Sequence, residues 1–109
     1  SHPTSRIILV WGMMRDKDRR GLIDPLLACV SEIVLTQATL ARSATVQELR
    51  ATLREWQGPV REAVRPMDAL TVARSRAMPH DLICIAGSLM LLGDIKAAVR
   101  GCGLSPIRG

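Results

Sequence analysis

The fold is decided by residues 7–12, Ile-Ile-Leu-Val-Trp-Gly, in which five apolar side chains follow one another and a glycine ends the run. A continuous apolar run of this length is typical of a strand that is buried on both faces of a parallel sheet. A second run, Leu-Ile-Cys-Ile-Ala, fills residues 82–86 and is also followed by a glycine. Two strands of this kind predict a sheet that helices cover on both faces.

Strand-like and helix-like segments alternate along the rest of the chain. Residues 32–36, Glu-Ile-Val-Leu-Thr, predict a further strand, and residues 60–64 alternate apolar and charged side chains, as in a less buried strand. Apolar residues recur at helical spacing in the segments between the strands. The helices expected there start after Asp18, run from Thr45 towards Gly58, cover residues 67–77 and cover residues 88–100.

Two helix starts carry local capping signals. Asp18 precedes the first helical segment, and a carboxylate there accepts a backbone N–H of the first turn. Thr45 and Glu48 have the spacing of a capping box, in which each side chain accepts the other residue's N–H. Strands that alternate with helices imply right-handed crossovers. The sequence therefore predicts an α/β, Rossmann-like three-layer domain with a mostly parallel sheet and helices on both faces.

Charge and aromatic content narrow the classes of partner. The formal net charge is +5, and the only aromatic residues are Trp11 and Trp56. A positive field favours anionic partners, although a genomic preference for arginine codons would give the same composition. The lack of aromatic side chains argues against nucleic acid, because single-strand binders stack bases on such rings.

The cysteines and the apolar runs bear on location. Cys29, Cys84 and Cys102 are odd in number and have no CxxC spacing, so neither zinc nor a disulfide framework is expected. Cys29 and Cys84 are both expected to be buried. The longest apolar run, residues 82–92, is too short to cross a bilayer. We expect a cytoplasmic protein with reduced thiols and no membrane partner.

Polar residues that follow the strands are the candidates for chemistry, because ligands of an open α/β sheet gather at the carboxyl ends of its strands. Asp16-Lys17-Asp18 follows the first strand, Arg42 the second and Gly87-Ser88 the run at 82–86. Ser88 at a helix start suits an anion, or it is simply an N-cap. The Asp-Lys-Asp triplet holds a substrate, or it caps a helix and forms surface pairs. His80 precedes its strand and is expected on the opposite edge.

Three segments together resemble the carboxy-terminal domain of bacterial folylpolyglutamate synthase/dihydrofolate synthase, a family of the Mur ligase superfamily. Residues 8–18 match its apolar strand followed by Gly-Met and Asp-Lys-Asp. Residues 32–44 match the next strand and its loop, with Ala41 in place of the family's proline. Residues 81–93 match the final strand and the Gly-Ser-Leu helix start.

The resemblance implies an amide ligase that uses ATP and Mg²⁺ to add L-glutamate to dihydropteroate or folate through an acyl phosphate. It implies that Ser88, Gly87 and Arg42 contact substrate and that Asp16, Lys17 and Asp18 line the same cleft or its nucleotide. It places no catalytic or metal-ligating residue in this chain.

The family's phosphate loop and carbamylated lysine belong to an ATP-binding central domain, which is the expected partner of this chain. We expect residues 1–109 to form one domain that lacks the family's first strand–helix unit and is inactive alone. A missing strand would leave an unpaired sheet edge, so the isolated chain is expected to self-associate. The alternative is a stand-alone, non-enzymatic α/β binding or interaction domain.

Overall fold

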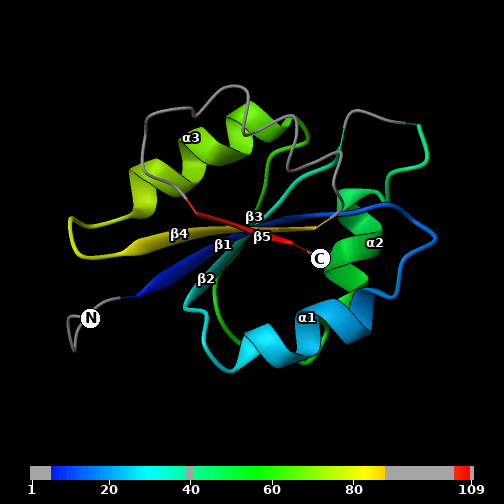
Figure 1. Cartoon of the computed structure of the whole chain (residues 1–109), viewed down its shortest axis with the longest axis horizontal. Helices are drawn as coiled ribbons and strands as arrows, with labels where there is room; N and C mark the ends of the chain where they lie inside the picture. The colour runs from blue at the N-terminus through cyan, green and yellow to red at the C-terminus, as the bar shows by residue number, and fades with distance from the viewer. Residues whose placement is uncertain (1–5, 39–40, 88–104, 109) are drawn as a thin grey trace.

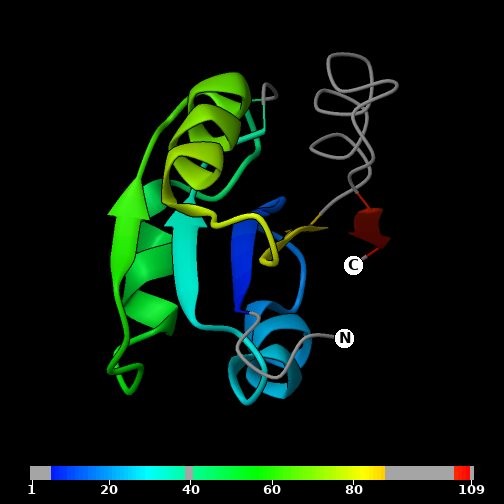
Figure 2. The same cartoon turned by 90° about the vertical axis from the view of Figure 1, so that its left-hand side faces the viewer.

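β1 (Ile7–Gly12) lies at the centre of the five strands that the structure describes, between β2 (Glu32–Leu35) and β4 (Leu82–Gly87). β3 (Val60–Glu62) flanks β2, and β5 (Ser105–Arg108) flanks β4. The computed structural model describes residues 6–38, 41–87 and 105–108. Every neighbouring pair of these strands is parallel, and Figure 2 shows the arrows of β3, β2 and β1 side by side with the same direction.

The described helices cover both faces of the sheet. α1 (Arg19–Leu27) and α2 (Val46–Thr52) pack on one face, and α3 (Pro66–Arg76) packs on the other (Figure 1). This arrangement confirms the predicted three-layer α/β class. Each helix that the structure describes is too short or too polar to span a lipid bilayer.

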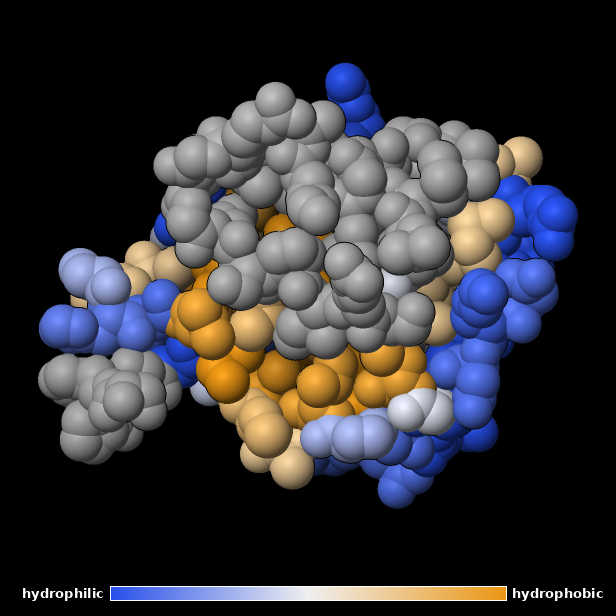
Figure 3. Space-filling view, viewed as in Figure 1, coloured by the Kyte–Doolittle hydropathy of each residue, from blue (hydrophilic) through white to orange (hydrophobic). Residues whose placement is uncertain are grey.

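Alternation along β1 explains why its whole sequence is apolar. Ile8 and Val10 contribute to the core under α3, whereas Leu9 and Trp11 contribute to the core under α1 and α2. All four side chains are fully buried, so either face would lose its core if the strand carried polar residues there. In Figure 3, apolar surface gathers over the middle of the molecule and hydrophilic residues lie around its rim.

Both capping signals are confirmed. Asp18 caps α1, because its Oδ1 accepts the N–H of Gly21 at 3.0 Å. Thr45 Oγ1 accepts the N–H of Glu48 at 3.1 Å, and Glu48 Oε1 accepts the N–H of Thr45 at 2.8 Å.

The end predicted for α2 is wrong. The helix ends at Thr52, and tighter turns follow, in which the N–H of Trp56 donates to the carbonyl of Leu53 at 2.8 Å. Gly58 therefore does not terminate the helix. It lies against the Trp56 ring, and any Cβ at Gly58 would collide with that ring. A side chain at residue 58 would therefore have to displace the indole of Trp56.

Other expectations are corrected or lie outside the described residues. Cys29 is exposed, because α1 ends two residues before it, while Cys84 is buried as expected. The strand at residues 82–87 is not the last one, since β5 follows it and pairs with it. The helix predicted over residues 88–100 falls outside the described part of the chain.

A network of charged side chains joins the strands at their amino ends. Glu32, at the start of β2, is only 3% exposed and accepts from Arg6 at 2.7 Å, Arg76 at 3.1 Å and Arg61 at 3.3 Å. Arg6 also pairs with Asp81 at 3.0 Å, directly before β4. One buried carboxylate thus links the amino edge of three strands to the end of α3.

We expect the chain to lose stability in acid because of this network. Burial pushes the pKa of Glu32 upwards, but hydrogen bonds and charge from Arg76 and then Arg6 outweigh it, so the pKa lies below its ordinary value. Backbone N–H groups of Met78 and Arg6, helped by the Arg6 guanidinium, lower the pKa of Asp81. Carboxyls with lowered pKa values stabilise the fold above their unfolded pKa, and this stabilisation is lost as the pH falls through the folded pKa.

The urea midpoint should therefore stay constant down to about pH 5 and fall below roughly pH 4. A Glu32→Gln variant should start from a lower midpoint and lose less of it between these pH values. An equal loss in the variant would contradict the role given to Glu32.

Candidate functional site

The loops that follow β1 and β2 meet at the carboxyl edge of the sheet. The N–H of Arg15 donates to the carbonyl of Arg42 at 2.8 Å, and the N–H of Ala44 donates to that of Met13 at 2.9 Å. This pairing brings Asp16 within 3.4 Å of the Arg42 guanidinium. Both side chains are largely exposed, at 62% and 79%. The two predicted loops therefore share one edge, as the sequence indicated.

Two glycines lie side by side where β1 and β4 end. Gly12 and Gly87 are partners in the parallel register. A Cβ on Gly12 would come within 2.7 Å of the carbonyl oxygen of Thr36, so the strands approach too closely there for a side chain. Gly87 has φ 147°, which favours glycine. Ser88, the next candidate residue, lies outside the described residues.

This pair of glycines marks the place where the order of the strands reverses. From β1 the chain proceeds outwards to β2 and β3, and it then returns to β4 on the other side of β1. In open α/β sheets the crevice at such a switch point is where ligands bind. The loop after β1 borders that crevice, and the loop after β2 is tied to it.

The three residues Asp16, Lys17 and Asp18 have different roles in the structure. The Asp18 carboxylate is occupied as the N-cap of α1, which is the structural alternative considered for it. Lys17 is exposed, and its ammonium makes no hydrogen bond or ion pair with any described residue. Asp16 is paired with Arg42. The ammonium group of Lys17 therefore remains available to bind an anion.

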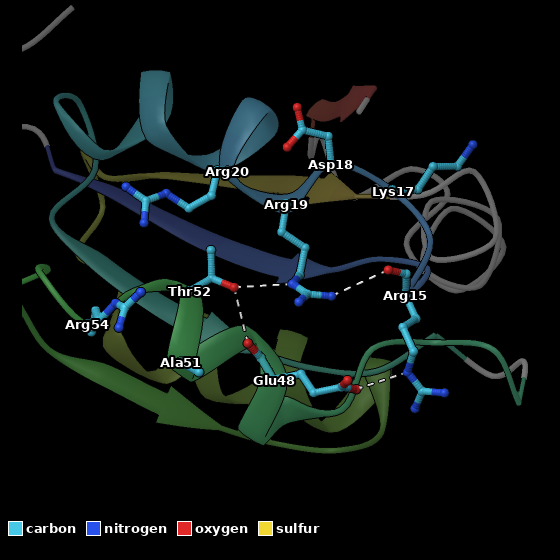
Figure 4. A pocket seen from close by; sticks show the side chains of 9 residues that line it. All are labelled: Arg15, Lys17, Asp18, Arg19, Arg20, Glu48, Ala51, Thr52 and Arg54. Atoms are coloured by element: carbon cyan, nitrogen blue, oxygen red, sulfur yellow. Dashed lines mark hydrogen bonds and ion pairs between the residues drawn. The ribbon is translucent and has the colours of Figure 1, made fainter.

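Beside this edge, α1 and α2 enclose an open pocket of about 480 Å³ (Figure 4). Two contacts shape it, since Arg15 pairs with Glu48 at 3.2 Å and Arg19 donates to Thr52 Oγ1 at 3.2 Å. Five cationic and two acidic side chains are among the residues that line it: Arg15, Lys17, Asp18, Arg19, Arg20, Glu48, Ala51, Thr52 and Arg54. The pocket is not among the predicted features, although the adjacent pair Arg19-Arg20 is a local sign of it in the sequence.

Other titratable groups lie away from this edge. His80 is in the turn before β4, at the amino edge, as predicted. Cys84 is buried in β4, and burial raises the pKa of its thiol. Among residues 6–38, 41–87 and 105–108, no group of three His, Cys, Asp or Glu side chains is arranged to hold a metal ion.

An open, doubly wound α/β domain with polar loops at its switch point is a ligand-binding class of fold. The family profile described as Mur ligase, glutamate ligase domain, matches residues 1–89. The chain belongs to this family, which confirms the superfamily indicated by the three sequence segments.

Relatives of known name point in the same direction. The chain is 30% identical over 89 residues to a probable bifunctional folylpolyglutamate synthase/dihydropteroate synthase of Haloferax volcanii, covering 81% of this chain and 10% of that protein. It is 28% identical to a Mycobacterium tuberculosis folylpolyglutamate synthase complexed with ADP and AMPPCP, with a TM-score of 0.77 over 94% of this chain and 24% of the other.

The E. coli FolC structure in complex with DHPP and ADP has the same fold, with a TM-score of 0.79 at 21% identity. That match covers 90% of this chain and 23% of the E. coli chain. The chain therefore spans about a quarter or less of the length of these relatives.

Proposed function

We propose that the chain serves as the carboxy-terminal domain of an ATP-dependent ligase that adds L-glutamate to dihydropteroate or folate. The observation that carries the proposal is the joined pair of loops, 13–18 and 41–44, beside the switch point of a Mur ligase glutamate ligase domain. The names of the relatives supply the substrate class. They give no support to the alternative of a non-enzymatic binding domain.

In this proposal the chain's own residues hold and orient anionic groups. Lys17 and Arg42 attract the carboxylates of the incoming glutamate, and Asp16 contacts the Arg42 guanidinium at 3.4 Å. Gly87, at the end of β4, lets the substrate approach the backbone closely, and Ser88 is proposed as a hydrogen-bonding group for it. A bound ATP supplies the phosphoryl group that activates the acceptor's carboxylate.

The remaining machinery is proposed to come from an ATP-binding central domain of the same enzyme, which would hold the nucleotide phosphates and Mg²⁺. On this reading residues 1–109 form one domain without the family's first strand–helix unit. A cytoplasmic location is proposed with it, because Cys29 and Cys84 are free thiols rather than parts of a disulfide.

The test is glutamate-dependent formation of ADP by the full-length product of the gene, with dihydropteroate or tetrahydrofolate as acceptor. Lys17→Gln removes the available cation without breaking a contact to any described residue. We expect kcat/KM for glutamate to fall about tenfold, equivalent to roughly 1.4 kcal/mol of transition-state stabilisation.

Arg65→Gln is the control, because Arg65 is an exposed cation at the start of α3, on the other face of the sheet. It should leave kcat/KM near the parent value. Absence of glutamate-dependent ADP formation with both acceptors would overturn the proposed function. Activity that is equally high in both variants would remove Lys17 from the site.

A further inference from the structure

The pocket between α1 and α2 has an excess of three positive charges, since five cations and two carboxylates line it. Both carboxylates are already engaged: Asp18 caps α1, and Glu48 accepts from the N–H of Thr45 and from Arg15. The Arg54 guanidinium has no hydrogen bond or ion pair with any described residue. The volume of the pocket, about 480 Å³, lies within the roughly 300–1,000 Å³ that is typical of small-ligand sites.

The cations are spread along the pocket rather than gathered at one point. Figure 4 shows Arg15 and Lys17 at one end, Arg20 and Arg54 at the other, and Arg19 between them. They come from the loop after β1, from α1 and from the turn after α2. The pocket therefore begins at the loop that pairs with residues 41–44 and leads away from the switch point.

This layout favours an extended polycarboxylate over a compact phosphate group. Phosphate usually binds to free N–H groups at a helix amino terminus. Here the Asp18 carboxylate accepts the N–H of Gly21 and sets a negative charge at that terminus of α1. Guanidinium groups match carboxylates with two parallel hydrogen bonds, and a row of them suits a chain of carboxylates.

We propose that this pocket binds the oligoglutamate tail of the acceptor substrate, a proposal that rests on the function proposed above. The carboxylates of successive glutamyl units lie against Arg15, Arg19, Arg20 and Arg54 as the tail leaves the crevice. The affinity for the acceptor then depends on the length of its tail because of this pocket. The residues at the switch point do not produce such a dependence.

The test is isothermal titration of the full-length gene product with a γ-linked glutamate pentamer and, separately, with ATP. The double variant Arg20→Gln/Arg54→Gln gives up only the exposed contacts of Arg20 with Asp24 and Glu55. Arg65→Gln/Arg74→Gln is the control, with the same change in charge on the α3 side of the sheet.

We expect the pentamer to bind the pocket variant about fivefold more weakly than the control, with ATP affinity equal in both. The loss should shrink at high salt, because exposed charges are screened. Equal pentamer affinity in both variants, or no pentamer binding to the parent, would overturn the proposal. A loss of ATP affinity would overturn it too and make the pocket a phosphate site.

Turnover separates this proposal from the function it rests on. With a monoglutamyl acceptor the pocket variant should keep the control's kcat/KM, and with a long-tailed acceptor its KM should rise. Ligation that does not depend on tail length in either variant overturns the tail pocket and leaves the ligase standing. Absence of ligation with arginine-dependent pentamer binding overturns the ligase and leaves a polycarboxylate site.

Discussion

Glu32→Ala should destabilise the chain by about 3 kcal/mol, a large part of the roughly 5–15 kcal/mol that stabilises a domain. The variant leaves Arg6, Arg61 and Arg76 without their shared acceptor and opens a cavity beside Ile33 at the start of β2. Breaking a buried ion pair costs about 3–5 kcal/mol. The three arginine side chains are 36–41% exposed and can regain water, which places the loss at the low end. Urea unfolding at pH 7 measures it.

Glu62→Ala is the matched control. Glu62 also accepts from an arginine, Arg50, but both side chains are at the surface, at 34% and 49% exposed. Exposed pairs contribute roughly 0–1 kcal/mol. If the two alanine variants unfolded at the same urea concentration, the buried network would have no special weight.

Gly12→Ala should cost roughly 1–3 kcal/mol, the usual range for overpacking a well-packed site. The new Cβ would meet the Thr36 carbonyl oxygen at 2.7 Å, and that oxygen belongs to the backbone. Relief requires β1 and β2 to separate where the N–H of Thr36 donates to the carbonyl of Trp11 at 2.9 Å. The same shift would disturb the crevice, so we expect weaker substrate binding as well as a lower urea midpoint.

Gly21→Ala provides the contrast on the same chain. A Cβ at Gly21 would meet only the end of the Asp18 side chain, which can rotate away. Alanine also gains up to about 1 kcal/mol over glycine inside a helix, which offsets part of the lost cap. Equal destabilisation by the two variants would show that the contact with Thr36 is not what makes Gly12 necessary.

Sequence patterns predicted those features that depend on neighbouring residues. The apolar runs at 7–11 and 82–86 had to be central strands, because only a strand covered on both faces needs no polar side. The caps at Asp18 and Thr45 follow from side chains that reach a backbone N–H three residues away. The candidate loops followed from one topological rule and from the positions of the strands.

Features that depend on distant residues were not predicted. The sequence places Glu32 at the start of a strand but does not indicate its ion pairs, because its arginine partners lie 26, 29 and 44 residues away in sequence. The basic pocket needs α1 and α2 side by side before its arginines become one surface. The helix predicted from Thr45 towards Gly58 includes Trp56, since helical spacing does not reveal that the chain leaves the helix at Thr52.

The position of β1 also sets the order in which the chain can fold during synthesis. β1 leaves the ribosome before the other strands described here, yet β4, which pairs with its second edge, begins only at Leu82. At about 5–20 residues per second, the 70 residues from Gly12 to Leu82 take roughly 4–14 s to make. For that time β1, whose side chains are almost all apolar, has one unpaired edge, so it can pair with β2 but cannot complete its core. Chaperones that bind short apolar segments would therefore matter most to β1.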